Sequence, residues 1–357
     1  MDRAVELAQS ALGTTSPNPA VGAVLVKNGS IIAEGYTLPP GRAHAEVIAL
    51  ENAGDNARGS SLYSTLEPCH HHGRTPPCTK AIIDAGVSKV CYAVVDPNPK
   101  VQGKGIDELN EAGITTYHLA DLGATELYEA FSKHINTGIP FVMAKFAMSL
   151  DGKIATHTGN SKWITDKPAR AFAHQLRRAS DAIIVGINTV LLDDPLLTAR
   201  DSSGQPLSSQ PLRVIVDSKG RTPTNSKCLQ SPGSTVIAMS SDNITKRNAL
   251  TQAGAEVIFQ NHGKPRVDLS ELLEYLGSRG VVSALVEGGG GILGSLFDDN
   301  LIDKVYTFLA PTIIGGEKAT SPVEGQGAKT LTQATTLNRI SVRQIGNDIL
   351  IQGYTRL

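Results

Sequence analysis

The sequence predicts an α/β protein with two domains, each built from alternating strands and helices. Its length of 357 residues corresponds to two domains at about 100–200 residues each. Apolar β-branched runs alternate with amphipathic stretches in both halves. A short Gly- and Pro-containing segment, residues 136–140, separates the two series. We therefore expect one domain over residues 1–139, with a three-layer α/β/α arrangement, and a second over residues 140–357.

The elements of the first domain are predicted from apolar periodicity and from Gly or Pro stops. Asn28-Gly29 lies between two apolar runs and predicts a β-hairpin, because both residues tolerate positive φ. Strands are expected at residues 20–26, 30–36, 60–68, 87–95 and 114–118, and helices at 1–13, 43–54, 79–85, 106–112 and 124–135.

The second domain shows the same alternation. Gly346-Asn347 between two alternating runs predicts a closing hairpin within residues 340–357, and the polar residues 200–210 predict a loop. Strands are expected at residues 141–150, 181–185, 212–217, 235–239, 256–259 and 283–287, and helices at 167–179, 244–253 and 269–278. A further helix is expected after the glycines at 288–291.

The composition excludes several classes of protein. With 40% hydrophobic and 19% charged residues, the chain is neither disordered nor a coiled coil. The formal net charge of −1 indicates no basic surplus, so we expect a small-molecule ligand rather than nucleic acid or a membrane surface. No signal peptide and no apolar run approaching about 18 residues is found. We expect a cytoplasmic protein whose four cysteines are reduced.

A metal site is predicted by His44-Ala45-Glu46 together with Cys69 and Cys78. One histidine and two thiolates supply three zinc ligands and leave the fourth position open, as in catalytic zinc sites. The pattern His-x-Glu followed by Pro-Cys is typical of zinc deaminases of nucleobases, in which the glutamate transfers protons and does not bind the metal. The eight residues between the cysteines exceed the usual two, so we expect a particular subfamily.

Two geometric conditions apply to this site, and simpler interpretations exist. His44 and Glu46 can converge only where the backbone of His44 is not yet helical. Cys78 is expected at the start of a helix, which favours its thiolate. Taken singly, His44 could be a surface histidine and the cysteines core residues. We assign His70, His71 and His72 to a loop with substrate contacts, and Cys91 to the core.

The glycine cluster at residues 288–291 follows an apolar strand and precedes a helix. Gly289, Gly291 and Gly294 match G-x-G-x-x-G, but no acidic residue follows at the distance that a Rossmann site requires. Two interpretations remain. The backbone N–H groups bind a phosphate at the helix N-terminus, which we favour, or the glycines form only a tight turn.

The first half resembles the deaminase half of the bifunctional deaminase–reductases of riboflavin biosynthesis. The resemblance rests on SPNPAVGAVLV from residue 16, HAE from 44, TLEPCHHHGRTPPC from 65 and DPNPKVQGKG from 96. His70 stands where that family commonly has a serine. The resemblance implies a cytidine-deaminase-like fold, a phosphoribosylaminopyrimidine substrate whose 2-amino group leaves as ammonia, and substrate contacts at Asn18, His71, Arg74, Asp96 and Asn98.

The second half is similar to the reductase half of the same family, which has a dihydrofolate-reductase-like fold. The matching stretches are KFAMSLDGKIA from residue 145, SKWIT from 161, VGINTVLLDDPLLTAR from 185, VDSKGR from 216 and LVEGGGGILGSLF from 285. This implies NADPH as the cofactor and hydride transfer to C1 of the ribose. The implied NADPH contacts are Ala147, Trp163, Thr189, Asp193, Ser218, Gly289, Gly290, Gly291, Ile292, Leu293, Gly294 and Ser295. The implied substrate contacts are Ser161, Arg177, Leu197, Arg200 and Glu287.

The resemblance implies deamination of 2,5-diamino-6-(5-phosphoribosylamino)pyrimidin-4(3H)-one and then reduction to 5-amino-6-(5-phosphoribitylamino)uracil. Two alternatives are weighed against it. A nucleoside or tRNA deaminase fused to an unrelated reductase fits the cysteine spacing and the neutral charge poorly. A binding module that has lost its catalytic site fits poorly with the intact His44, Glu46, Cys69 and Cys78. The sequence leaves the oligomeric state open, a homo-oligomer included.

Overall fold

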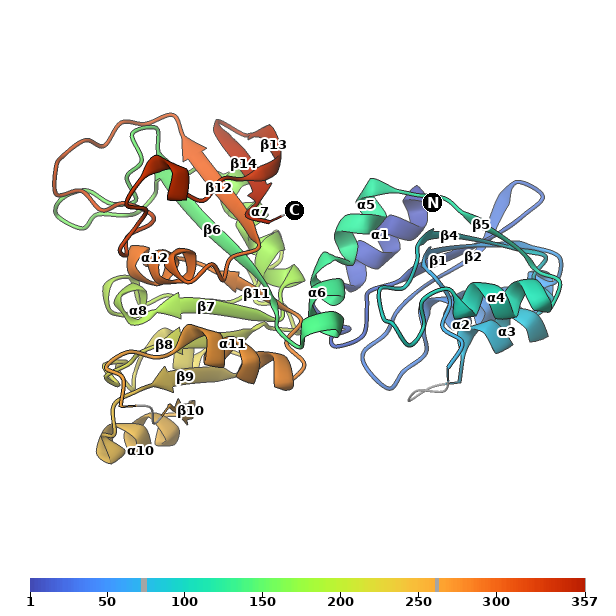
Figure 1. The fold of residues 1–357 in the computed structure, drawn as a ribbon, viewed down its shortest axis with the longest axis horizontal. Helices are drawn as coiled ribbons and strands as arrows, with labels where there is room; N and C mark the ends of the chain where they lie inside the picture. The colour runs from blue at the N-terminus through green and yellow to red at the C-terminus, as the bar shows by residue number, and fades with distance from the viewer. Residues whose placement is uncertain (72–75, 261–262, 357) are drawn as a thin grey trace. The chain divides into compact units, whose positions relative to one another are not determined.

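The computed structural model describes residues 1–71, 76–260 and 263–356. The chain divides into two compact units, Met1–Ile139 and Pro140–Leu357 (Figure 1). Each unit has its own sheet, of five and nine strands respectively. Among the described residues, no helix combines the length and the apolar character needed to cross a membrane.

The first unit is a five-stranded sheet between two layers of helices, which confirms the predicted α/β/α arrangement. The strand order is β2-β1-β3-β4-β5, with β1 antiparallel to both β2 and β3 and the remaining neighbours parallel. Helices α1 and α5 contact each other in one layer, and α2, α3 and α4 follow one another in the other layer (Figure 1). The strands are β1 (Gly22–Lys27), β2 (Ser30–Tyr36), β3 (Ser61–Leu66), β4 (Lys89–Val94) and β5 (Thr115–His118). The α-helices are α1 (Asp2–Ala11), α2 (Ala45–Ala53), α3 (Cys78–Asp84), α4 (Lys104–Glu111), α5 (Leu122–Leu127) and α6 (Glu129–Thr137).

Local turn chemistry explains how this sheet begins and how α2 lies against it. Asn28 and Gly29 have φ values of 52° and 76°, so they form the predicted hairpin turn. Helix α2 packs so closely on β2 that a Cβ at Gly35 would lie 2.3 Å from the carbonyl oxygen of Ala45. Glycine at this position therefore lets the first turn of α2, which bears Glu46 and directly follows His44, sit directly on the sheet.

The prediction of one helix over residues 124–135 is wrong, because the chain forms two helices there. Tyr128 separates α5 from α6 with φ −104° and ψ 3°. Its side chain is buried, and its hydroxyl lies 2.6 Å from Oγ1 of Thr65 on β3. The contact that anchors this hydroxyl to the sheet occurs where the backbone departs from helical geometry. Apolar periodicity alone does not reveal such a break.

The second unit is a nine-stranded mixed sheet in the order β10-β9-β8-β7-β11-β6-β12-β14-β13. Strands from β10 to β12 in this order are parallel, and β14 and β13 close the sheet as antiparallel neighbours. Ile183, Ile215 and Ile237, on three neighbouring strands, are fully buried in its core. The strands are β6 (Phe141–Ser149), β7 (Ala182–Gly186), β8 (Leu212–Val216), β9 (Thr235–Met239), β10 (Glu256–Phe259), β11 (Ser283–Val286), β12 (Lys304–Ala310), β13 (Asn338–Ile345) and β14 (Asp348–Tyr354). The α-helices are α7 (Lys167–Ala179), α8 (Ile187–Asp193), α9 (Lys227–Gln230), α10 (Ile244–Gln252), α11 (Leu269–Ser278) and α12 (Gly290–Asp298).

One central strand of this sheet is absent from the sequence predictions. Strand β12 pairs with β6 on one side and with β14 on the other. Six of its seven residues are buried, so it lacks the alternation by which a half-buried strand is identified. The predicted strands β9 and β10, the helices α7 and α11 and the closing hairpin are confirmed.

Candidate active sites

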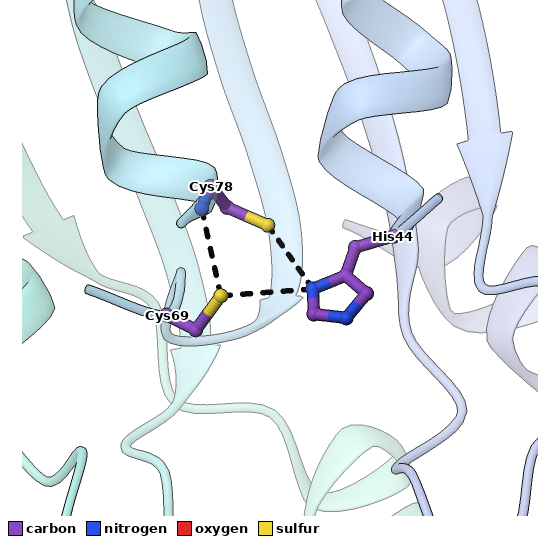
Figure 2. Close-up of side chains that lie close together, drawn as sticks. All are labelled: His44, Cys69 and Cys78. Atoms are coloured by element: carbon purple, nitrogen blue, oxygen red, sulfur yellow. Dashed lines mark hydrogen bonds between the residues drawn. The ribbon is translucent and has the colours of Figure 1, made fainter. Parts of the chain in front are cut away.

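Three side chains at the ends of elements converge in the first unit (Figure 2). His44 precedes α2 with an extended backbone, φ −78° and ψ 164°, and Cys78 is the first residue of α3. Cys69 follows β3, and its sulfur accepts a hydrogen bond from the backbone N–H of Cys78. Both geometric conditions inferred from the sequence are therefore met: His44 is not helical, and Cys78 begins a helix.

The spacing of these three ligand atoms fits a zinc ion. Nδ1 of His44 lies 3.3 Å from Sγ of Cys78 and 3.6 Å from Sγ of Cys69. All three potential ligand atoms lie within 4.8 Å of one another. Tetrahedral zinc with Zn–N of about 2.1 Å and Zn–S of about 2.3 Å separates nitrogen from sulfur by about 3.6 Å. The donor set and its geometry therefore suit zinc with one coordination position left for water.

Glu46 lies beside this cluster on the first turn of α2. Its side chain is only 3% exposed, and Oε2 accepts a hydrogen bond of 3.5 Å from Sγ of Cys78. Burial raises the pKa of the Glu46 carboxyl, and the nearby His44 opposes that rise. A buried carboxyl with a raised pKa is suited to accept and return a proton.

The thiol of Cys69 is prepared for metal binding by its neighbours. Hydrogen bonds from Cys78, with a further one from His44, lower the pKa of Cys69 to about 4 against the opposing effect of burial. A thiolate is the form that binds zinc. The backbone N–H of Cys78, at the start of α3, is one of these donors.

A cavity of about 640 Å³ opens onto His44, Glu46 and Cys69. Four of the substrate contacts implied by the resemblance line it: Asn18, His71, Asp96 and Asn98. Arg74, the fifth, and His72 lie outside the described residues. The sequence analysis missed part of the wall, which consists of Lys100, Val101 and the α6 residues Phe131, His134 and Ile135. No local motif marks the α6 residues, because only tertiary packing brings them to the cavity.

Glu67 holds one wall of this cavity although it is not itself a predicted site residue. Its buried carboxylate accepts three backbone hydrogen bonds, from Asp96 at 3.1 Å, Gly103 at 3.0 Å and Gly105 at 3.0 Å. The segment that contains Asp96 and Asn98 is thereby fixed next to Cys69. Its place in the Glu-Pro-Cys run is the signal that could have identified it.

Asp96, held in this way, has an altered acidity. Burial raises the pKa of its carboxyl to about 6, although the N–H of Asn98 donates to Oδ1 at 2.8 Å and opposes the rise. The negative Glu67 adds a smaller upward effect. Asp96 can therefore change its charge within the cavity close to neutral pH.

Two cavities in the second unit share Gly289 (Figure 1 shows the unit). The larger cavity lies where the parallel strands β7 and β8 end, and the smaller one is lined by β6 and by the residues that follow β11; the carboxyl ends of strands are the usual ligand site of such sheets. The cavity of about 580 Å³ is lined by Ala147, Ser161, Trp163, Arg177, Thr189, Asp193, Leu197, Arg200, Glu287, Gly289 and Leu293. The cavity of about 1130 Å³ is lined by Ser218, Gly289, Gly291, Ile292 and Ser295 among the predicted contacts.

The predicted glycine cluster divides into two groups in the structure. Gly289 and Gly291 line a cavity. A Cβ at Gly290 would instead lie 2.8 Å from atoms of Glu324 and from the carbonyl oxygen of Ser321, and one at Gly294 would lie 2.2 Å from the carbonyl oxygen of Glu324. Gly290 and Gly294 therefore allow residues 321–325 to pack on α12, a role that neither of the two sequence interpretations included.

Charged side chains that the sequence analysis did not single out also line these cavities. Lys145 of β6 lies in the smaller one, and burial lowers its pKa although the nearby Glu287 opposes that change. His174 of α7 lies there too. The larger cavity is lined by the cations Lys219, Arg221, Lys264 and Arg266. The basic residues that follow Ser218 and precede Asp268 were visible in the sequence, but nothing local connects the two segments.

Comparison with known proteins finds a matching family for each unit. Residues 1–94 match the cytidine and deoxycytidylate deaminase zinc-binding region, and residues 140–351 match the RibD C-terminal domain. The riboflavin biosynthesis protein RibD of Actinobacillus pleuropneumoniae is 41% identical over 354 residues, covering 98% of this chain and 93% of the relative. RibD of Escherichia coli is 38% identical over 361 residues, with 98% and 97% covered.

Solved structures give the same result. An Acinetobacter baumannii RibD structure superimposes with a TM-score of 0.86 at 36% identity, covering 99% of this chain and 97% of that one. A Thermotoga maritima protein described as a diaminohydroxyphosphoribosylaminopyrimidine deaminase/5-amino-6-(5-phosphoribosylamino)uracil reductase gives a TM-score of 0.85 at 34% identity, with the same coverage.

The fold and the two sites define a class of enzyme in which a zinc-dependent cytidine-deaminase-like unit is joined to a dihydrofolate-reductase-like unit. The resemblance inferred from the sequence motifs is confirmed. This chain belongs to the RibD family of riboflavin biosynthesis proteins.

Proposed function

We propose that this chain catalyses two successive steps of riboflavin biosynthesis in the order implied by its family. The unit Met1–Ile139 would hydrolyse the 2-amino group of 2,5-diamino-6-(5-phosphoribosylamino)pyrimidin-4(3H)-one to release ammonia. The unit Pro140–Leu357 would then use NADPH to reduce the ribosyl group, giving 5-amino-6-(5-phosphoribitylamino)uracil. The bounds of these two catalytic domains are part of the proposal.

In the deaminase unit, His44, Cys69 and Cys78 would hold the zinc, which when bound activates water for attack on the pyrimidine carbon. Glu46 would take a proton from that water and return it to the departing nitrogen, which leaves as ammonia. Its burial and raised pKa support this role. Asn18, His71, Asp96 and Asn98, which line the cavity, would orient the pyrimidine. By the family resemblance, Arg74 would contact the phosphate.

In the reductase unit, NADPH supplies the hydride when bound, and the protein's contribution is alignment. Ala147, Trp163, Thr189, Asp193 and Leu293 would contact the cofactor in the smaller cavity, and Ser218, Gly291, Ile292 and Ser295 in the larger one. Gly289 borders both cavities. Ser161, Arg177, Leu197, Arg200 and Glu287 would surround the substrate. We assign Gly290 and Gly294 to the packing of residues 321–325 on α12 rather than to direct cofactor contacts.

The convergence of His44, Cys69 and Cys78 beside the buried Glu46 is the observation that most supports this function. The test is incubation of the full chain with the diaminopyrimidine substrate, with and without NADPH, followed by ammonia assay and product mass. We expect ammonia release without NADPH, and a further gain of two hydrogens in the product only when NADPH is present. Reduction without deamination, or activity on free nucleosides or tRNA alone, would contradict the proposal.

We further propose that the chain acts in the cytoplasm on this small-molecule substrate and does not use nucleic acid or a membrane as a partner. The near-neutral net charge supports this. Self-association into a homo-oligomer remains part of the proposal, and analytical ultracentrifugation of the full chain measures it directly.

A further inference from the structure

We propose that Asp166 and Asp348 are positioning residues of the reductase, which together hold the loop that presents Trp163 to the cofactor cavity. The proposal rests on the proposed function of this unit, because it takes Trp163 as a cofactor contact. Neither aspartate belongs to the set of residues implied by the family resemblance. Both lie outside the cavity and act through the loop of residues 161–165.

The loop of residues 161–165 borders the smaller cavity along its whole length. Trp163 is 72% exposed, which is unusual for so large an apolar side chain. The guanidinium of Arg170 lies 4.6 Å from the centre of its ring, and Nη1 of Arg170 donates to the carbonyl oxygen of Thr165 at 2.5 Å. An exposed ring needs a fixed backbone if it is to meet a ligand at a defined place.

That backbone is fixed by a reciprocal pair of hydrogen bonds between distant parts of the chain. The N–H of Asp166 donates to Oδ2 of Asp348 at 2.9 Å. The N–H of Asn347 donates in return to Oδ2 of Asp166 at 2.8 Å. Oδ1 of Asp166 also accepts the N–H of Ala169 at 3.3 Å and so caps α7. The turn between β13 and β14 is thus fastened to the residue that ends the Trp163 loop.

The turn has the shape that this contact requires. Gly346 has a φ of 62°, and a Cβ there would lie 2.3 Å from Oδ2 of Asp166. Asp348 is 2% exposed, although it borders a surface turn. A hairpin can close without a buried carboxyl. It can also close without a glycine that leaves room for Asp166.

The two carboxyl groups differ in whether an asparagine can replace them. Both oxygens of Asp166 accept backbone N–H groups, so an asparagine there would direct its NH₂ at one of the donors. Asp348 accepts one N–H, and the two side chains also hydrogen-bond to each other. Burial raises the pKa of Asp348, while the N–H of Asn347 lowers that of Asp166. Because Asp348 accepts a single backbone N–H, the amide oxygen of an asparagine can accept that bond while its NH₂ faces the Asp166 carboxylate. Arg170 is the cation that faces both groups.

The test uses four full-length variants: Asp348→Ala, Asp348→Asn, Asp166→Asn and, as a matched control, Asp181→Ala. Asp181 likewise accepts backbone N–H groups, from Val282 and Ser283, but at the amino ends of the central strands β7 and β11. Trp163 is the only tryptophan, so its fluorescence anisotropy and its quenching by acrylamide report on the loop in the cofactor-free protein. Calorimetric titration with NADPH measures binding without turnover.

We expect Asp348→Ala and Asp166→Asn to lower the anisotropy of Trp163, increase its quenching and weaken NADPH binding by about tenfold. The KM for NADPH should rise as binding weakens, while kcat should change by less than about threefold. Asp348→Asn should stay within about twofold of the wild type, and Asp181→Ala should lower the melting temperature without moving the Trp163 signals.

Unchanged anisotropy and NADPH affinity in both Asp348→Ala and Asp166→Asn would overturn the proposal, and so would equal changes in Asp181→Ala. If one variant does not fold, the other still decides. Failure of the wild type to bind NADPH would instead contradict the proposed function, and the anisotropy comparison in cofactor-free protein would still decide whether the two aspartates hold the loop.

Discussion

Arg177 of α7 and Glu287, which follows β11, form a two-point ion pair in the smaller cavity of the reductase unit. Nε and Nη2 of Arg177 donate to the two carboxylate oxygens of Glu287 at 2.5 and 2.8 Å. Nη1 of the same guanidinium donates to the carbonyl oxygen of Thr198 at 3.2 Å. Arg177 therefore both neutralises Glu287 and fixes the loop that contains Leu197 and Arg200.

Replacing Arg177 with leucine should destabilise the reductase unit by about 3–5 kcal/mol at neutral pH, because it leaves a buried carboxylate without its partner. Burial alone would raise the pKa of Glu287, but Arg177, with help from Lys145, lowers it to about 2. In the wild type this depressed pKa contributes stability that is present above about pH 4.5 and is lost as pH falls through about 2.

In the variant, Glu287 instead takes up a proton as the pH falls. The destabilisation measured by urea unfolding should therefore shrink between about pH 7 and pH 4. The double variant Arg177→Leu/Glu287→Leu should recover a large part of the lost stability. A destabilisation that does not depend on pH would show that Glu287 is not the group left uncompensated.

Glu67→Gln should disturb the cavity wall of the deaminase unit while leaving the metal in place. One amide oxygen cannot accept the three backbone N–H groups that the carboxylate accepts, and its NH₂ opposes the remaining donors. We expect a loss of about 1–3 kcal/mol in unfolding free energy, a raised KM for deamination and an unchanged zinc content. Glu111→Gln, on the exposed surface of α4, is the matched control. Loss of zinc from Glu67→Gln would contradict this role.

Gly290→Ala and Gly291→Ala separate packing from cofactor contact at the start of α12. A methyl group at Gly290 meets Glu324 and Ser321 at 2.8 Å, so this variant should have a clearly lower melting temperature. At Gly291 the nearest atom outside its own helix backbone and chain neighbours, Oε2 of Glu324, is 3.6 Å away, so the methyl group fits, and Gly291 itself lines the larger cavity. Gly291→Ala should melt normally but bind NADPH more weakly, by about tenfold, which is roughly 1.4 kcal/mol.

Calorimetric titration and thermal melts of the two glycine variants decide the matter. Normal NADPH affinity in a well-folded Gly291→Ala protein would place the phosphate contact elsewhere. A normal melting temperature in Gly290→Ala would show that residues 321–325 shift to accommodate the methyl group at little cost in stability.

Asp96→Asn should change how stability depends on pH. The pKa of Asp96 is raised to about 6 by burial, so its contribution is present below about pH 4 and is lost as pH rises through about 6. Relative to the wild type, the asparagine variant should gain stability between about pH 5 and pH 8, by an amount on the order of 1–2 kcal/mol. Its amide oxygen can still accept the N–H of Asn98.

Asp84→Asn, which alters an exposed carboxyl on α3, controls for general effects of charge. The two variants are compared by chemical unfolding at matched zinc concentration. Equal pH dependence in both would show that Asp96 titrates as an ordinary surface aspartate.

Local signals predicted most of the fold. Asn28-Gly29, the helix stops and the alternation of the closing hairpin depend on neighbouring residues, so sequence alone was sufficient there. Strand β12 was missed although the equally buried strands β9 and β11 were predicted; it lacks alternation, and Lys304 and Thr307 interrupt its apolar run. The break at Tyr128 was missed because it accompanies a hydrogen bond to Thr65 on a distant strand.

The same distinction applies to the sites. His44, Glu46, Cys69 and Cys78 belong to motifs whose spacing indicates their chemistry, and the structure brings them together. Phe131 and His134 reach the deaminase cavity only through the packing of α6, and Gly290 meets Glu324 only through a later loop. Contacts of this kind leave no pattern in a single sequence, because the partners lie far apart along it.

Glu46→Gln tests whether the two chemistries reside in two separate units of one chain. Glu46 is not expected to bind zinc, so the variant should keep one zinc per chain while it releases no ammonia. Its NADPH oxidation should match the wild type when the already deaminated substrate is supplied. We expect full zinc, no deamination and normal reduction in the same variant. Loss of zinc, persistent ammonia release, or a reductase rate that falls in parallel with deamination would contradict it.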